Sequence, residues 1–177
     1  MHRCNSLFPG LLLRVLLVAC ALACASLLPV PGQAEGLDAR FLRALDGDSM
    51  RVEHAGEVLE VRLIGVDAPE YRQEYSRKAK DFSRNFCQGK TLCLEFDRER
   101  NDRYGRTLAY VYAEDHMLNE ELVRAGLAIP LRIKPNTRYY DRFKQAEEQA
   151  RREKRGFWIK GGLDMTPGRW RRTHRRK

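Results

Sequence analysis

Residues 57–70 read Glu-Val-Leu-Glu-Val-Arg-Leu-Ile-Gly-Val-Asp-Ala-Pro-Glu, and this stretch carries both a strand pattern and several charged side chains. Apolar residues at positions 59, 61 and 63 alternate with Glu60 and Arg62, which is the period of a half-buried strand. Just upstream, the segment 54–57 (His-Ala-Gly-Glu) has the composition of a hairpin turn. We therefore expect residues 39–66 to form consecutive strands, and Pro69 to end the last of them.

The rest of the chain alternates between helical and strand periods. Helical spacing is predicted over residues 71–88, strands over 92–96 and 108–113, a short helix over 119–126 with Asn119 as its N-cap, and a final helix from residue 139 to near residue 156. The polar segment 97–105 is expected to be a loop. Five strands interrupted by helices suit a small closed barrel of the oligonucleotide-binding (OB) kind. The predicted fold class is therefore α+β, mainly β, with a five-stranded barrel and three helices.

Residues 1–34 have the pattern of an export signal. Arg3 and Arg14 precede an apolar run over residues 15–30, and Pro-Gly-Gln-Ala at 31–34 resembles a cleavage site. The alternatives are an uncleaved membrane anchor and a lipoprotein, since the stretch ending at Cys20 resembles a lipobox. We expect a secreted or periplasmic protein that contacts a membrane only if the leader is retained or acylated.

Positive charge is concentrated near the C-terminus. Hydrophobic content of 43% and charged content of 32% are ordinary for a soluble globular domain. Residues 169–177 hold six of the 33 Lys and Arg, and two more precede residue 35, which leaves 25 against 24 acidic residues in the body. We expect one domain over residues 35–160, followed at 161–177 by a basic, disordered tail. A nearly neutral body excludes attraction to polyanions through the charge of the body as a whole.

Two of the five cysteines, Cys87 and Cys93, lie in the expected mature chain. An even count in an oxidising compartment allows one disulfide between them. The alternative is that Cys87 is simply a small buried apolar residue.

Charged residues in three separate segments are candidates for one site. Asp48 lies between two expected strands, Asp67 and Glu70 follow the strand that carries Arg62, and Arg106 ends the polar loop. Carboxylates suit a hard metal such as Ca²⁺, and guanidinium groups suit a phosphate. Each motif taken alone has a simpler reading as a turn or a strand end. A charge at position 62, between two apolar strand residues, nevertheless requires a partner.

The combination resembles the staphylococcal nuclease (thermonuclease) family. The similarity covers residues 39–158, and its main motifs are 45–70, 96–113 and 119–128. It implies a metal-dependent nuclease of that fold, with Arg62, Glu70 and Arg106 as catalytic residues. It also implies one Ca²⁺ held by Asp48, Asp67 and the carbonyl of Ala68, where the family has Thr.

The resemblance further implies hydrolysis of DNA and RNA with little sequence preference, leaving 3′-phosphate ends. Arg103 and Lys134 are expected to contact substrate. Tyrosines that stack on the base in the family's founding enzyme find no match, because Leu-Arg-Ile stands at 131–133 before Lys134. We expect a monomer without a stable protein partner. The main alternative is a catalytically inactive nucleic-acid-binding OB-fold module.

Overall fold

The computed structural model describes residues 36–174. The export signal expected at residues 1–34 lies outside the described residues. Within residues 36–174, no helix combines the length and the apolar character that a membrane span requires.

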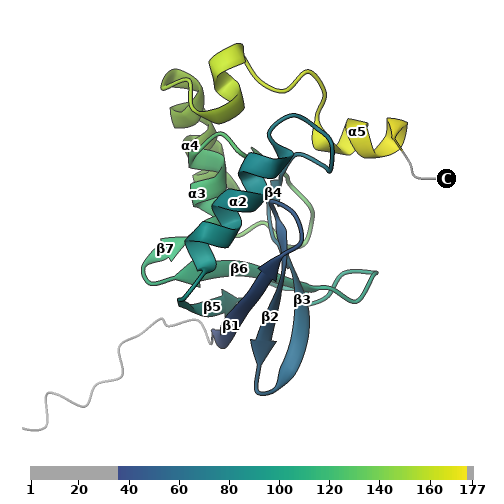
Figure 1. The fold of residues 1–177 in the computed structure, drawn as a ribbon, viewed down its shortest axis with the longest axis vertical. Helices are drawn as coiled ribbons and strands as arrows, with labels where there is room; N and C mark the ends of the chain where they lie inside the picture. Colours follow the sequence, from purple (N-terminus) through teal and green to yellow (C-terminus); the bar gives the residue numbers. More distant parts are fainter. Residues whose placement is uncertain (1–35, 175–177) are drawn as a thin grey trace, which may run out of the picture. The chain divides into compact units, whose positions relative to one another are not determined.

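Five strands form a closed, mixed β-barrel (Figure 1). They are β1 (Leu37–Ala44), β2 (Ser49–His54), β3 (Glu57–Leu63), β5 (Thr91–Glu95) and β6 (Thr107–Ala113). The antiparallel order is β3-β2-β1-β5-β6, and a parallel pairing of β3 with β6 closes the barrel. The expected five-stranded, OB-like α+β fold is confirmed.

The alternating strand pattern places one side of each strand in the core. Val61 and Leu63 on β3 are almost fully buried, as are Leu92 and Leu94 on β5. The residues between these core positions, such as Cys93, point outward and are partly exposed. The period of two read from the sequence therefore describes the inside and the outside of the barrel.

Three helices lie beside the barrel where the sequence predicts them. They are α2 (Ser76–Cys87), α3 (Leu118–Arg124) and α4 (Tyr140–Arg152), with the short 3₁₀-helix η2 (Gly156–Lys160) after α4. The helical spacing from residue 71 places the start of α2 too early. The chain makes a turn first, with the Gln73 N–H bonded to the Glu70 carbonyl (2.8 Å), and Tyr75 has a left-handed φ of 66°.

Asn119 is not the N-cap of α3, which is a second correction. The cap position is Met117, and Asn119 lies inside the helix with its side chain fully buried. Its Oδ1 accepts from the Val111 N–H (3.0 Å), and its Nδ2 donates to the Ile64 carbonyl (2.8 Å). Asn119 therefore ties α3 to β6 and to the turn that follows β3.

The C-terminal segment also differs from the expectation of a disordered tail. Residues 167–173 form helix α5 (Pro167–Thr173), whose N-cap Thr166 accepts from the Arg169 N–H (3.3 Å). The remaining strands are short: β4 (Val66–Asp67) pairs with β8 (Ile129–Pro130), and β7 (His116–Met117) pairs with β6.

Cys87 and Cys93 are not bonded to each other. Cys87 lies on the buried face of α2, whereas Cys93 lies on the outward-facing side of β5, between two core leucines. The structure therefore does not contain the disulfide that the even cysteine count allows, and the burial of Cys87 agrees with the alternative of a small buried apolar residue.

Candidate active site

Strand pairing brings the first two carboxylates to one arginine. Asp48 directly precedes β2, and Ser49 is the register partner of Arg62 on β3. Asp67 ends the short strand β4, four residues after β3. The Nη2 of Arg62 lies 3.2 Å from Asp48 Oδ2 and 3.4 Å from Asp67 Oδ1. A single guanidinium nitrogen therefore lies between the two predicted metal ligands.

Backbone groups fix the position of Arg62. Its Nη1 donates to the Leu63 carbonyl (2.6 Å), and its Nη2 donates to the Val66 carbonyl (2.9 Å). The side chain is only 13% exposed. A largely buried arginine that is held by carbonyls and faces two carboxylates keeps a defined orientation, which recognition of a phosphate requires.

Asp48 is buried and tightly surrounded. Its Oδ2 accepts from the Ala68 N–H (2.6 Å), and its Oδ1 accepts from the Ser49 hydroxyl (3.3 Å). Burial raises the pKa of Asp48 from 3.8 to about 6, although the charge of Arg62 opposes this shift. The ionised form of Asp48 therefore destabilises the folded protein, and a bound cation would remove this destabilisation.

Gly47 allows Asp48 to lie this deep. A Cβ at position 47 would lie 2.6 Å from the Cβ of Ala68 and 2.7 Å from that of Ala79 on α2. The Ser83 hydroxyl of α2 donates to the Gly47 carbonyl (2.6 Å). The turn before β2 is therefore pressed against helix α2 and against the segment after β4, and only glycine fits there.

Asp67 and Glu70 share a partner that the sequence did not indicate. Arg171 on α5 donates from Nη1 to Asp67 Oδ1 (2.9 Å) and from Nη2 to Asp67 Oδ2 (3.1 Å), and its Nη1 also bonds Glu70. Burial raises the pKa of Asp67, and the hydrogen bond from Arg171 acts in the opposite direction. No local pattern distinguishes Arg171 from the other basic residues near the C-terminus.

Arg106 approaches from the loop that precedes β6. Its Nε and Nη2 lie 2.8 Å and 2.7 Å from Asp102 Oδ2, and its backbone N–H donates to Asp102 Oδ1 (3.0 Å). Burial pushes the pKa of Asp102 upward, but the hydrogen bonds from Arg106 and Tyr104 outweigh it and lower the pKa below its ordinary value. Asp102 thus orients the Arg106 guanidinium, which remains 29% exposed.

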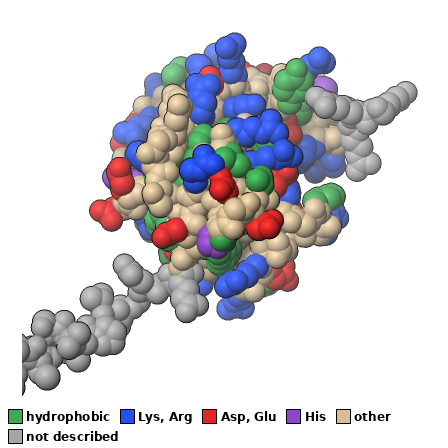
Figure 2. Space-filling view, turned by 60° about the horizontal axis from the view of Figure 1, so that its bottom comes forward, with side chains coloured by type: hydrophobic (Ala, Val, Ile, Leu, Met, Phe, Trp, Pro, Cys, Tyr) green, Lys and Arg blue, Asp and Glu red, His purple; other side chains and the backbone are tan. Residues whose placement is uncertain are grey.

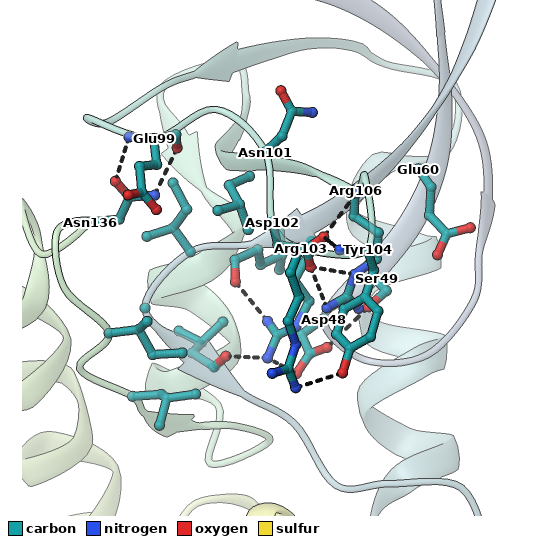
Figure 3. A pocket seen from close by; sticks show the side chains of 18 of the residues that line it. Asp48, Ser49, Glu60, Glu99, Asn101, Asp102, Arg103, Tyr104, Arg106 and Asn136 are labelled. Carbon is teal, nitrogen blue, oxygen red and sulfur yellow. Dashed lines mark hydrogen bonds and ion pairs between the residues drawn. The ribbon is translucent and has the colours of Figure 1, made fainter.

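One hollow of about 950 Å³ is lined by most of these groups, namely Asp48, Arg62, Glu70, Asp102, Arg106 and Arg171 (Figure 3). Arg103 and Lys134, the two predicted substrate contacts, line it as well. One wall is held by Asn136, whose side chain bonds both the N–H (2.9 Å) and the carbonyl (2.8 Å) of Glu99. In Figure 3 the Glu99–Asn136 pair lies on one side of the hollow, and Asp48, Arg103 and Arg106 lie on the other side.

The donor set fits a hard divalent cation. Asp48 and Asp67 offer buried carboxylate oxygens on either side of the Arg62 Nη2. Among residues 36–174, no group of three or more His, Cys, Asp or Glu side chains could hold a metal. A cation here would therefore have two carboxylates, and a backbone carbonyl and water would complete its shell, as is common for Ca²⁺.

The structure brings most of the predicted site residues together. Arg62, Glu70 and Arg106 all line the hollow with Asp48, Asp67 is bonded to Arg171 of the lining, and the Ala68 N–H is bonded to Asp48. Arg103 is exposed and donates to the Tyr104 hydroxyl (2.7 Å). The two cysteines are not among the lining residues.

A small OB-like barrel that carries two neighbouring carboxylates and two arginines in one site indicates an enzyme that cleaves phosphodiester bonds. Comparison with known proteins identifies the family. The protein-family model described as "Staphylococcal nuclease homologue" matches residues 60–160 of the chain. The chain is 38% identical over 125 residues to the thermonuclease of Staphylococcus hyicus, covering 67% of this chain and 74% of that protein.

Two proteins of Bacillus subtilis strain 168 are also similar. The SPbeta prophage-derived endonuclease YokF is 38% identical over 136 residues, which cover 72% of this chain and 46% of YokF. Endonuclease YncB is 38% identical over 134 residues, which cover 71% of this chain and 64% of YncB. The chain therefore belongs to the staphylococcal nuclease family, and it is a nuclease, a hydrolase of nucleic-acid phosphodiester bonds.

Proposed function

We propose that this nuclease is a Ca²⁺-dependent endonuclease that cleaves DNA and RNA with little sequence preference and leaves 3′-phosphate ends. The observation that carries the proposal is the position of the Arg62 Nη2, within 3.4 Å of both Asp48 and Asp67. A phosphate bound to Arg62 would lie next to a cation bound to those two carboxylates. Asp48, Asp67 and the Ala68 carbonyl would hold the Ca²⁺, which supplies positive charge beside a phosphate oxygen.

The side chains of this chain then have separate tasks. Glu70 accepts a proton from the attacking water, whose oxygen bonds to phosphorus as the bond from phosphorus to the 5′-oxygen breaks. Arg62 and Arg106 donate hydrogen bonds to the phosphate oxygens, on which negative charge increases. The departing 5′-oxygen takes up a proton from solvent, so that the products carry a 3′-phosphate and a 5′-hydroxyl.

Low sequence preference is supported by the lining of the hollow next to Lys134. Leu131 and Ile133 contribute apolar side chains there, and Ile133 is 62% exposed. Such side chains offer no hydrogen bonds to base edges, which favours low sequence preference. Basic side chains gather in the upper half of the face in Figure 2, which favours a polyanionic substrate of either sugar type.

The experiment compares cleavage of end-labelled DNA and RNA in Ca²⁺, in Mg²⁺ and in chelator. We expect efficient cleavage with Ca²⁺, weak cleavage with Mg²⁺ and none in chelator. The 3′ ends should be extended by a polymerase only after phosphatase treatment. Asp48→Ala and Asp67→Ala should raise the Ca²⁺ requirement. Arg62→Lys, Glu70→Gln and Arg106→Lys should lower kcat at saturating Ca²⁺ by at least about 10²-fold.

If all five variants cleave at near the wild-type rate, the activity resides elsewhere. If the wild type binds nucleic acid without cleaving it, the inactive-module alternative is correct. Export is proposed on the sequence of residues 1–34, which predicts a mature chain beginning near Glu35. Intact-mass analysis of the exported protein tests this, and an acylated Cys20 or a retained leader would contradict it.

A further inference from the structure

Helix α5 places a cation on the acids of the site. Arg171 contacts both oxygens of Asp67, at 2.9 and 3.1 Å, and also bonds Glu70. Asp67 is 104 residues away in sequence. The two parallel bonds to Asp67 have the fork geometry of a strong arginine–carboxylate pair.

The segment that carries Arg171 is anchored by other interactions. Gln73, itself buried, donates to the Met165 carbonyl and accepts from the Glu70 N–H (3.0 Å). Leu163 packs against the small cluster of Ala150, Phe157 and Trp158. A Cβ built on Gly168 would lie 4.0 Å from Asp67 Oδ2. The backbone of α5 therefore approaches the site, and its position there does not depend on one long side chain alone.

The pairing with Arg171 is incompatible with the chemistry assigned to these acids. Both Asp67 oxygens are occupied by guanidinium N–H groups, so a cation bound there must displace Arg171 or share its charge. Glu70 is bonded to Arg171 through one carboxylate oxygen, so that oxygen is not free to bond the attacking water. Arg62 already lies within ion-pair distance of both Asp48 and Asp67.

We propose that α5 is an autoinhibitory segment, in which Arg171 takes the place of the divalent cation on Asp67, and also occupies Glu70, until Ca²⁺ displaces it. This inference rests on the proposed function, since it assigns the cation site to Asp67. Arg171 does not take part in the reaction; it controls access to two groups that do.

The size of the effect follows from the fraction of molecules in which Arg171 is released. The apparent affinity for a ligand falls in proportion to the population of the competent state. If Arg171 covers the acids in about four molecules out of five, removing it should lower the apparent Kd for Ca²⁺ about fivefold, and more for a tighter pairing.

The test is titration of the purified protein with Ca²⁺ in an isothermal calorimeter, without nucleic acid. Arg171→Gln should lower the apparent Kd at least about fivefold, and the Ca²⁺ concentration for half-maximal cleavage should fall by a similar factor. Arg171→Lys should lie between the two, because one ammonium cannot form the paired bonds to Asp67. Arg172→Gln, a change of the adjacent exposed arginine on α5, controls for the removal of one positive charge.

Three outcomes separate this inference from the proposed function. A lower Kd in Arg171→Gln with an unchanged Kd in Arg172→Gln supports the inference. Equal Kd values in wild type and Arg171→Gln, or equal decreases in both glutamine variants, show that Arg171 does not compete with the cation, while the nuclease function stands. No Ca²⁺ binding by the wild type or by either Arg171 variant overturns the cation site itself, and the inference with it.

Discussion

Replacing Asp48 by Asn should stabilise the metal-free protein, although Asp48 is a proposed metal ligand. The pKa of Asp48 is raised from 3.8 to about 6 by burial. A raised pKa means that the folded state holds the proton more tightly than the unfolded chain does. Between about pH 4 and 6 the unfolded chain loses the proton first, so the free energy of unfolding falls as pH rises through this window.

Above about pH 6, the charged Asp48 lowers the free energy of unfolding by the full amount of the shift. The shift corresponds to at most about 3 kcal/mol at pH 7, since each pKa unit is worth about 1.4 kcal/mol. Asn keeps an oxygen that can accept from the Ala68 N–H and from Arg62, so the main change is the removal of the buried charge. Asp48→Asn should therefore be more stable than wild type by up to about 3 kcal/mol at pH 7 and by much less at about pH 4.

Urea unfolding in chelator at several pH values measures this difference. Asp115→Asn, in the exposed turn before β7, controls for the removal of one negative charge from the whole chain. Adding Ca²⁺ at about 1,000 times its Kd should reverse the order, because binding at that concentration stabilises the wild type by about 4.1 kcal/mol. An Asp48→Asn protein that is less stable than wild type in chelator, by an amount independent of pH, would refute the reasoning.

Three further predictions concern the supports of the site. Gly47→Ala should lower the free energy of unfolding by about 1–3 kcal/mol in urea titrations, because its Cβ would overlap those of Ala68 and Ala79. Asn119→Ala should lower it by about 1–3 kcal/mol, because it leaves the buried Val111 N–H without a partner, and unfolding at constant pH checks this. Deleting residues 169–177 should weaken nucleic-acid binding and reduce its log–log salt slope by roughly 0.7–0.9 for each phosphate that this segment neutralises, with turnover at saturating Ca²⁺ retained.

The resemblance to the nuclease family indicated the candidate site residues, and the strand pattern explains why they lie together, since most of them stand at the ends of strands. The alternation around Arg62 fixes β3, and the pairing of β2 with β3 then brings Asp48 to the side of that arginine. Asp67 follows after a short turn. These relations depend on local periodicity and on short connections, which are the features that a single sequence reveals best.

The supports of the site depend on interactions between distant segments, and a local pattern cannot reveal these. Asn119 has the residue type and position of an N-cap, yet its amide serves β6 and the turn after β3. Arg171 belongs to a run of basic residues that composition alone assigns to a solvated tail. Its function in the structure comes from Gln73 and Leu163, which hold the preceding segment in place.

The two aspartates proposed as metal ligands, Asp48 and Asp67, differ in how their charge is balanced. Asp67 is paired with Arg171 and also lies beside Arg62, whereas Arg171 does not reach Asp48. Burial raises the pKa of both carboxyl groups; Arg62 is the arginine that opposes the shift at Asp48, whereas Arg62 and Arg171 both oppose it at Asp67. A cation bound between them therefore relieves unbalanced charge at Asp48 and replaces an existing partner at Asp67. Asp48 should therefore contribute most of the affinity for the metal. Asp67 should determine how that affinity is controlled, because the cation binds there only when Arg171 of α5 is displaced.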